Sequence, residues 1–180
     1  MGAHRPSGAR FFCSRGALAA LALAVAPAHA VTVILASPGG GPNQQISIQV
    51  GSGGGAIDVV GFTLPANQVA DGTEITGTPS VEIEVSARRA NPNTATYTLT
   101  VDSSQPLVNG AHAIPFTLFR WTTSDADIPA GTFDGTANQL LLQFQNSRRI
   151  SNTHTFIYAN TVVPEPGTYL GQVTYTLSAP

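Results

Sequence analysis

Few side chains in this sequence have the types and spacing that catalysis requires. His112 and His154 are the two histidines after residue 30, and each stands alone. A catalytic triad needs Ser, His and a carboxylate together, and the sequence has no Gly-x-Ser-x-Gly turn to present a serine nucleophile. We therefore expect both histidines to be ordinary surface residues, no catalytic residue, and a protein that is not an enzyme.

The carboxylates offer little more. Asp125, Asp127 and Asp134 form the densest acidic stretch, but they lack the ligand and glycine spacing of a calcium-binding EF-hand loop. Glu82 and Glu84 project from one face of an alternating segment, as glycosidase carboxylates could, or as residues on the solvated face of a sheet do. We favour solvated residues in both cases and predict neither a metal site nor a cofactor.

Two arginine pairs, Arg88-Arg89 and Arg148-Arg149, fall at the ends of expected strands. They could bind an anion, but charged residues of this kind more often discourage edge-to-edge association of sheets. Trp121 lies in an alternating segment, as do four phenylalanines. Core packing is the first interpretation for these rings, ahead of a carbohydrate-binding platform. The phenylalanines are Phe116, Phe133, Phe144 and Phe156.

The elements that position these residues read as strands, because apolar and polar residues alternate through most of the chain after residue 30. Val81-Glu82-Ile83-Glu84-Val85 is the clearest case. This pattern predicts an antiparallel β-sandwich. The expected strands are Val31–Ala36, Gln45–Val50, Ala56–Leu64, Val81–Arg88, Thr94–Asp102, Ile114–Thr123, Gln139–Asn146, Thr153–Asn160 and Tyr169–Leu177.

Glycine and proline separate these strands without dividing the chain into domains. The expected breaks are Pro38–Pro42, Gly51–Gly55, the turn Asn91-Pro92-Asn93 and the turn at Val108-Asn109-Gly110. One short pattern, Gly-Thr-aromatic-x-Gly, occurs twice, at 131–135 and 167–171. It suggests that glycine admits a close backbone approach and that the aromatic ring then enters the core.

Residues 1–30 have the features of a secretory signal peptide. A basic start precedes the apolar run Gly16–Val25, and Ala28-His29-Ala30 fits a cleavage site. The run is too short to span a membrane, and the start lacks an Arg-Arg pair, so we expect export by the general secretory route. We expect residues 31–180 to form a single β-sandwich domain with no membrane insertion.

The composition of residues 31–180 narrows the partners. The only cysteine is Cys13, so this part of the chain forms no disulfide. Five arginines and ten carboxylates give it a net charge of −5. Nucleic acids and anionic membranes are poor partners for such a surface.

The C-terminal segment Gly167-Thr168-Tyr169 leading into Val173, Tyr175 and Leu177 resembles the closing strand of chaperone–usher pilin subunits, including the spore coat protein U-like branch. At the other end, Val31, Val33 and Leu35 alternate ahead of the Pro38–Pro42 linker, as donor segments of that family do. The resemblance covers only the two ends. The chain departs from it in lacking a disulfide and in having Ala179 at the penultimate position, where the family often has tyrosine.

The resemblance implies a sandwich of immunoglobulin or pilin-like type, in a subunit that lacks one strand. A periplasmic chaperone and then a like subunit would supply that strand by β-strand addition. Gly167, Tyr169, Val173, Tyr175 and Leu177 would form the assembly strand, and Val31, Val33 and Leu35 the donor. The alternative for Val31–Ala36 is the first strand of a self-contained sandwich.

We therefore expect an exported, non-enzymatic structural or adhesive subunit located in the periplasm, at the cell surface or outside the cell. The competing hypothesis is a monomeric secreted module that binds a ligand such as carbohydrate through loops and exposed aromatic rings.

Overall fold

The computed structural model describes residues 32–36, 44–51, 59–89 and 95–179, and of residues 32–36, 44 and 89 it describes only the backbone. The expected signal peptide, Val31 of the donor segment, the Pro38–Pro42 linker, most of Gly51–Gly55 and the Asn91–Asn93 turn lie outside these residues. No helix in the described part of the chain has the length and apolar character needed to cross a membrane.

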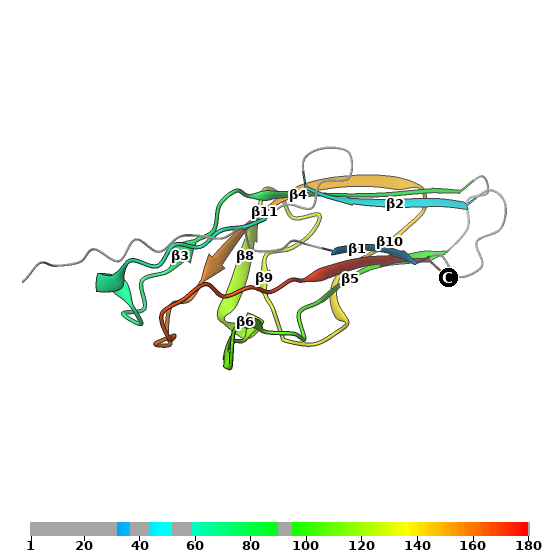
Figure 1. Cartoon of the computed structure of the whole chain (residues 1–180). Coiled ribbons are helices and arrows are strands. Elements are labelled where there is room, and N and C mark those ends of the chain that lie inside the picture. Colours follow the sequence, from blue (N-terminus) through cyan, green and yellow to red (C-terminus); the bar gives the residue numbers. More distant parts are fainter. Residues whose placement is uncertain (1–31, 37–43, 52–58, 90–94, 180) are drawn as a thin grey trace, which may run out of the picture.

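The described residues form an all-β domain with two main sheets (Figure 1). The first sheet has the strand order β1-β12-β5-β10, and the second has the order β2-β4-β11-β8-β9 with the short β3 also paired to β11. The first sheet comprises β1 (Thr32–Ala36), β12 (Thr174–Ser178), β5 (Thr96–Asp102) and β10 (Gln139–Gln145). The second comprises β2 (Gln44–Val50), β3 (Ile75–Thr76), β4 (Val81–Arg89), β8 (Phe119–Thr123), β9 (Gly131–Thr132) and β11 (Arg148–Tyr158).

Three smaller elements complete the described chain. A hairpin joins β6 (Leu107–Asn109) to β7 (His112–Ile114), and Gly110, at φ +59°, occupies the turn between them. This confirms the turn expected at Val108-Asn109-Gly110. Two single-turn 3-10 helices, η1 (Ala66–Gln68) and η2 (Phe116–Leu118), lie in the connections.

The alternation read from the sequence is confirmed in the central strands. In β4, Val81, Ile83 and Val85 are buried, whereas Glu82 is exposed and Glu84 is partly exposed. In β5 the buried residues are Tyr97, Leu99 and Val101. Burial of these alternate side chains between two sheets is the main favourable term for such a fold, and it is consistent with a sandwich.

Several strand boundaries differ from the expectation. In the described part of the expected strand Ala56–Leu64, Gly61 makes only an isolated bridge with Thr78. The expected strand Ile114–Thr123 is divided after Ile114, because Pro115 has no N–H to continue the ladder and the 3-10 turn η2 follows. β11 starts five residues earlier than expected, at Arg148.

An aromatic cluster fills one part of the core. Phe133 contacts Phe116, Trp121 and Phe156, with ring centroids 5.6, 4.9 and 5.9 Å apart. Phe119 packs on Tyr158 at 5.0 Å. Trp121 is only 3% exposed, and its indole Nε1 donates a hydrogen bond to the carbonyl oxygen of Pro129 at 2.9 Å. These rings therefore stabilise the core, as expected from the sequence.

Candidate functional site: the paired first and last strands

The two ends of the described chain lie side by side at one edge of the first sheet. β1 pairs with β12 in parallel, from Thr32 opposite Thr174 to Ala36 opposite Ser178. β12 pairs on its other side with β5 in antiparallel register. β1 is therefore an edge strand, with β12 as its single sheet neighbour among the described residues (Figure 1).

The register places the proposed donor and assembly residues opposite one another. Val33 is opposite Tyr175, and Leu35 is opposite Leu177. Tyr175 and Leu177 are 1% and 0% exposed and belong to the main core. The two terminal segments that the sequence singles out therefore pair with each other. The same register would form if β1 came from a second copy of the chain.

The entry to β12 differs from the sequence expectation. The strand begins at Thr174, not at Tyr169, because the preceding residues pack on the β6–β7 hairpin. Leu170 makes an isolated bridge with Val108, with N···O distances of 2.8 and 3.0 Å. A Cβ on Gly171 would lie 2.9 Å from Leu107, so this close approach requires glycine. Val173, immediately before the strand, is buried.

The remaining assembly residues lie at the start of this entry. Gly167 has φ +152°, and a Cβ there would overlap the Asn109 side chain. Tyr169 is half-buried, and its hydroxyl donates to the carbonyl oxygen of Glu165 at 3.2 Å. Gly131, at the first copy of the repeated pattern, also allows a close approach, because its Cβ would lie 2.7 Å from Trp121. Both copies therefore use glycine for contact, but only the ring of the first copy, Phe133, is fully buried.

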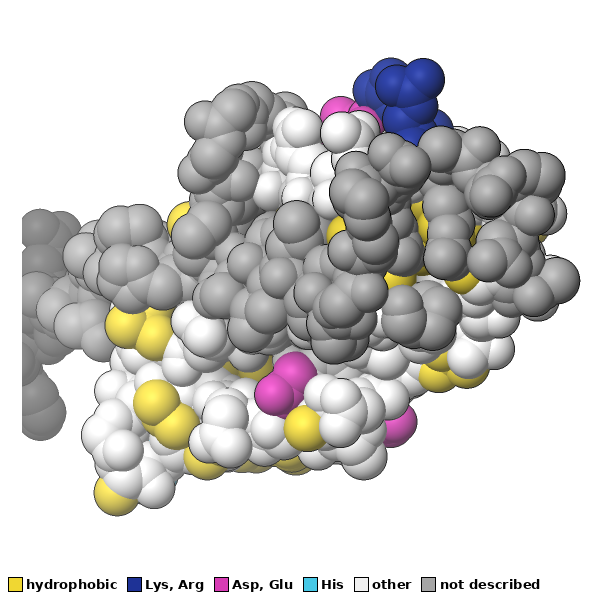
Figure 2. All heavy atoms as spheres, turned by 90° about the vertical axis from the view of Figure 1, so that its right-hand side faces the viewer, with side chains coloured by type: hydrophobic (Ala, Val, Ile, Leu, Met, Phe, Trp, Pro, Cys, Tyr) yellow, Lys and Arg dark blue, Asp and Glu magenta, His cyan; other side chains and the backbone are white. Residues whose placement is uncertain are grey.

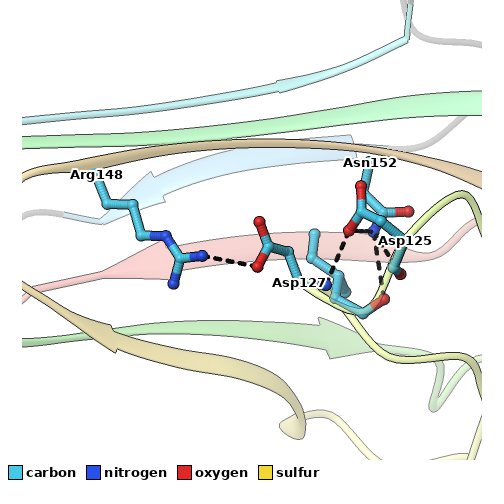
Figure 3. A network of polar contacts seen from close by, with 5 residues as sticks. Asp125, Asp127, Arg148 and Asn152 are labelled. Atoms are coloured by element: carbon cyan, nitrogen blue, oxygen red, sulfur yellow. Dashed lines mark hydrogen bonds and ion pairs between the residues drawn. The ribbon is translucent and has the colours of Figure 1, made fainter.

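The acidic stretch after β8 is held by protein groups (Figure 3). Asp125 Oδ1 accepts hydrogen bonds from the Asp127 backbone N–H at 2.8 Å and from Asn152 Nδ2 at 2.9 Å. Asp127 forms an ion pair with Arg148 at 2.7 Å. Among the described residues no group of three His, Cys, Asp or Glu side chains is arranged to hold a metal ion. These carboxylates therefore organise the 124–130 loop.

The arginine pairs lie on strands that are central in the strand order, but at ends where each strand has one described neighbour. β4 lies between β2 and β11, and β11 lies between β4 and β8. Arg149, 73% exposed, forms an ion pair with Glu84 at 2.5 Å, and arginine side chains gather beside a carboxylate at one corner of this end of the molecule (Figure 2). At Arg88 and Arg89, β4 pairs with β2 but no longer with β11, and at Arg148 and Arg149, β11 pairs with β4 but not with β8. The expectation that these pairs discourage edge-to-edge association therefore stays a prediction.

The prediction that both histidines lie on the surface is confirmed for His112 and wrong for His154. His112 is exposed on β7, but His154 is fully buried on β11 and stacks on Trp121 at 6.0 Å with an interplanar angle of 12°. Neither ring nitrogen of His154 has a hydrogen-bond partner among the described residues. Desolvation by this burial lowers the pKa of His154 from 6.5 to about 4. The alternation of apolar and polar residues along this strand did not predict which face of the sheet His154 occupies.

Sequence reasoning missed two buried asparagines that hold loops. The Asn160 side chain donates to the carbonyl oxygens of Gln68 and Thr73 and to Asp71, and it accepts from the Ala70 N–H. Asn152 binds the 124–130 loop in a similar way. No local motif marks either residue, because each bonds to a segment at least 24 residues away.

Comparison with known proteins adds no family assignment: no protein-family model matches the chain, and no curated protein matches its sequence.

Proposed function

We propose that this protein is an exported, non-enzymatic structural or adhesive subunit that assembles by β-strand exchange at the β1–β12 edge. The observation that carries the proposal is the parallel pairing of the first described strand with the last, at the border of the first sheet. A finer assignment to an immunoglobulin or pilin-like sandwich, cleaved from its signal peptide and delivered to the periplasm or cell surface, belongs to the same proposal.

The physical basis is the interchangeability of an edge strand. A sheet edge accepts any extended segment that supplies main-chain hydrogen bonds and apolar side chains at alternate positions. β1 has one ladder to break, whereas a central strand has two. A copy of residues 32–36 from a neighbouring subunit would reproduce the same pairing with β12.

An edge left without β1 would be unfavourable. The outer backbone groups of β12 would lose their partners, and β12, which carries the buried Tyr175 and Leu177, would itself become the edge strand. The proposed partners are therefore a chaperone that covers this edge before assembly and a like subunit that covers it afterwards.

The positions of the aromatic side chains do not support the alternative of a carbohydrate-binding module. Trp121 is buried in the core, and none of the large hydrophobic side chains exposed in the described residues is aromatic. Carbohydrate platforms use exposed aromatic faces, so we do not propose this function.

Deletion of residues 31–37 tests the proposal. We expect the shortened protein to be insoluble or unfolded by itself and to recover its β-sheet circular dichroism when a peptide of residues 31–37 is added. The reason is that the peptide restores the backbone hydrogen bonds along the outer side of β12. A shortened protein that folds alone as a stable monomer would contradict strand exchange.

Two variant peptides provide the matched control. Aspartate at positions 33 and 35, opposite the buried Tyr175 and Leu177, should abolish the rescue. Aspartate at positions 32 and 34, opposite the half-buried Thr174 and Thr176, should weaken it much less. Equal rescue by both peptides would show that the peptide does not bind in the β1 register.

A further inference from the structure

We propose that the 124–130 loop opens at acid pH. Protonation of His154 releases the loop, and the buried His154–Trp121 pair then becomes accessible to solvent. The proposal is independent of strand exchange, because it concerns the second sheet and the loop that follows β8.

The loop is bonded to two residues near His154, Trp121 on β8 and Asn152 on β11. Trp121, which stacks on that ring, donates its indole N–H to Pro129 in the loop. Asn152, two residues before His154 on β11, donates to the carbonyl oxygens of Asp125 and Ile128 at 3.1 and 3.4 Å. Ile128 itself is fully buried. Trp121 and Asn152, which lie beside His154, therefore hold the loop together with the Asp127–Arg148 ion pair.

His154 is the residue whose protonation destabilises the closed loop. Its ring contacts Trp121 and Phe156, with centroids 6.0 and 6.1 Å away, and it contributes no hydrogen bond among the described residues. A neutral imidazole tolerates such a site, but an imidazolium would be a buried charge with two unpaired donors. Any opening that brings the ring to water is therefore favoured by protonation.

The charged groups on the neighbouring elements do not supply a partner for that charge. From the loop, Asp125 acts on the ring and partly offsets the desolvation, but it forms no hydrogen bond with either ring nitrogen. Arg88 and Arg89 lie at the opposite end of β4 from Val81, which pairs with His154. Other charged groups of the adjoining elements are bonded to other residues. They are Glu82 with Ser151, Glu84 with Arg149, Arg120 with Glu74, and Asp127 with Arg148.

The opposite sheet carries one described carboxylate, Asp102 at the end of β5, which accepts hydrogen bonds from the backbone N–H and the hydroxyl of Ser104. The titratable core residues of that sheet are Tyr97 and Tyr175, and phenols are neutral at acid pH. The same holds for Tyr158 on β11. The acid response of the loop therefore depends on His154.

The direction follows from the two protonation states. The pKa of His154 is about 4 when it is buried and about 6.5 when it is exposed to water. The closed loop is fully stable above about pH 6.5 and loses stability progressively as the pH falls towards 4. Linkage between these two values makes the opening constant about 30-fold larger at pH 5 than at pH 7.5.

Hydrogen exchange of the Trp121 indole proton measures this opening directly. Trp121 is the only tryptophan in the chain, so its Nε1–H gives a single resolved NMR signal. After correction for intrinsic exchange, we expect its protection to fall about 30-fold between pH 7.5 and pH 5. Protection that does not change with pH would overturn the proposal.

Backbone amides of the central strand β5 distinguish loop release from global unfolding. We expect the Trp121 indole to be less protected than the best-protected β5 amides at each pH, because the loop opens while the sheet remains formed. Equal protection at every pH would mean that the indole exchanges only by global unfolding and would overturn loop release.

Two variants assign the effect to the correct histidine. His154→Leu should remove the pH dependence of the Trp121 protection, whereas His112→Gln, at an exposed position, should retain it. An unchanged pH dependence in His154→Leu would refute the role of His154. Should that variant fail to fold, NMR titration of His154 in the unaltered chain decides, because a pKa at or above 6.5 would also refute the proposal.

Discussion

Single buried polar side chains organise the loops of this protein. Asn160 is 0% exposed and connects β11 to the η1 region through four hydrogen bonds, with donor–acceptor distances from 2.6 to 3.1 Å. Its backbone has φ +50°, a conformation that asparagine tolerates better than most residues. The Asn160 side chain therefore holds segment 68–73 in place, which neither a helix nor a strand ladder does for most of its residues.

Replacement of Asn160 tests this role. Asn160→Ala should lower the free energy of unfolding by about 2–3 kcal/mol, because it leaves several partly buried backbone groups without partners. Urea denaturation measures the change, and Asn138→Ala, at an exposed position, should have little effect. Equal stability of the two variants would show that the 68–73 segment finds other partners at no cost.

At the scale of elements, close contact between a strand and a ring fixes the edge of the second sheet. β9 has only two residues, and Gly131 in it lies against the face of Trp121. The same ring is held by Pro129, by Phe133 and by stacking on His154. Glycine at this position therefore allows the 124–130 loop to return to β8.

A methyl group at Gly131 should disturb this contact. Gly131→Ala places a carbon 2.7 Å from the Trp121 ring, and we expect the free energy of unfolding to fall by about 1–3 kcal/mol, as overpacking does. Denaturation followed by Trp121 fluorescence measures both stability and the environment of the ring. In Gly61→Ala the nearest atom would be 3.7 Å away, so this control should retain most of its stability.

At the scale of the molecule, the core contains one titratable group that opposes folding in acid. Burial holds the pKa of His154 at about 4, so the unfolded chain binds a proton that the folded chain excludes between about pH 6.5 and pH 4. Stability is retained above this window and lost as the pH falls through it.

The free energy of unfolding should therefore depend on pH, and His154→Leu should remove the part of this dependence that His154 causes. Between pH 7.5 and pH 5, the unaltered protein should lose about 2 kcal/mol more free energy of unfolding than His154→Leu does. Urea denaturation at the two pH values measures the difference, with His112→Gln expected to behave like the unaltered chain. Identical losses in all three proteins would contradict the exclusion of a proton by His154.

The sequence by itself determined the strand pattern and much of the core. Alternation of small and branched apolar residues with threonine or glutamate identified β4 and β5, because a two-residue period is a property of the local chain. The interior location of Trp121 and Phe133 followed from the same pattern. The expectation of a turn at Asn109-Gly110 was also confirmed, since that turn depends on local backbone conformation.

Only the tertiary structure decided which strands are neighbours and which residues face inward where alternation is ambiguous. The parallel pairing of β1 with β12 joins residues about 140 positions apart, and the placement of the arginine pairs on central strands follows from strand order. The burial of His154 and the contacts of Asn160 arise in the same way. Local sequence cannot encode these features, because each depends on groups that come together only when the sheets pack.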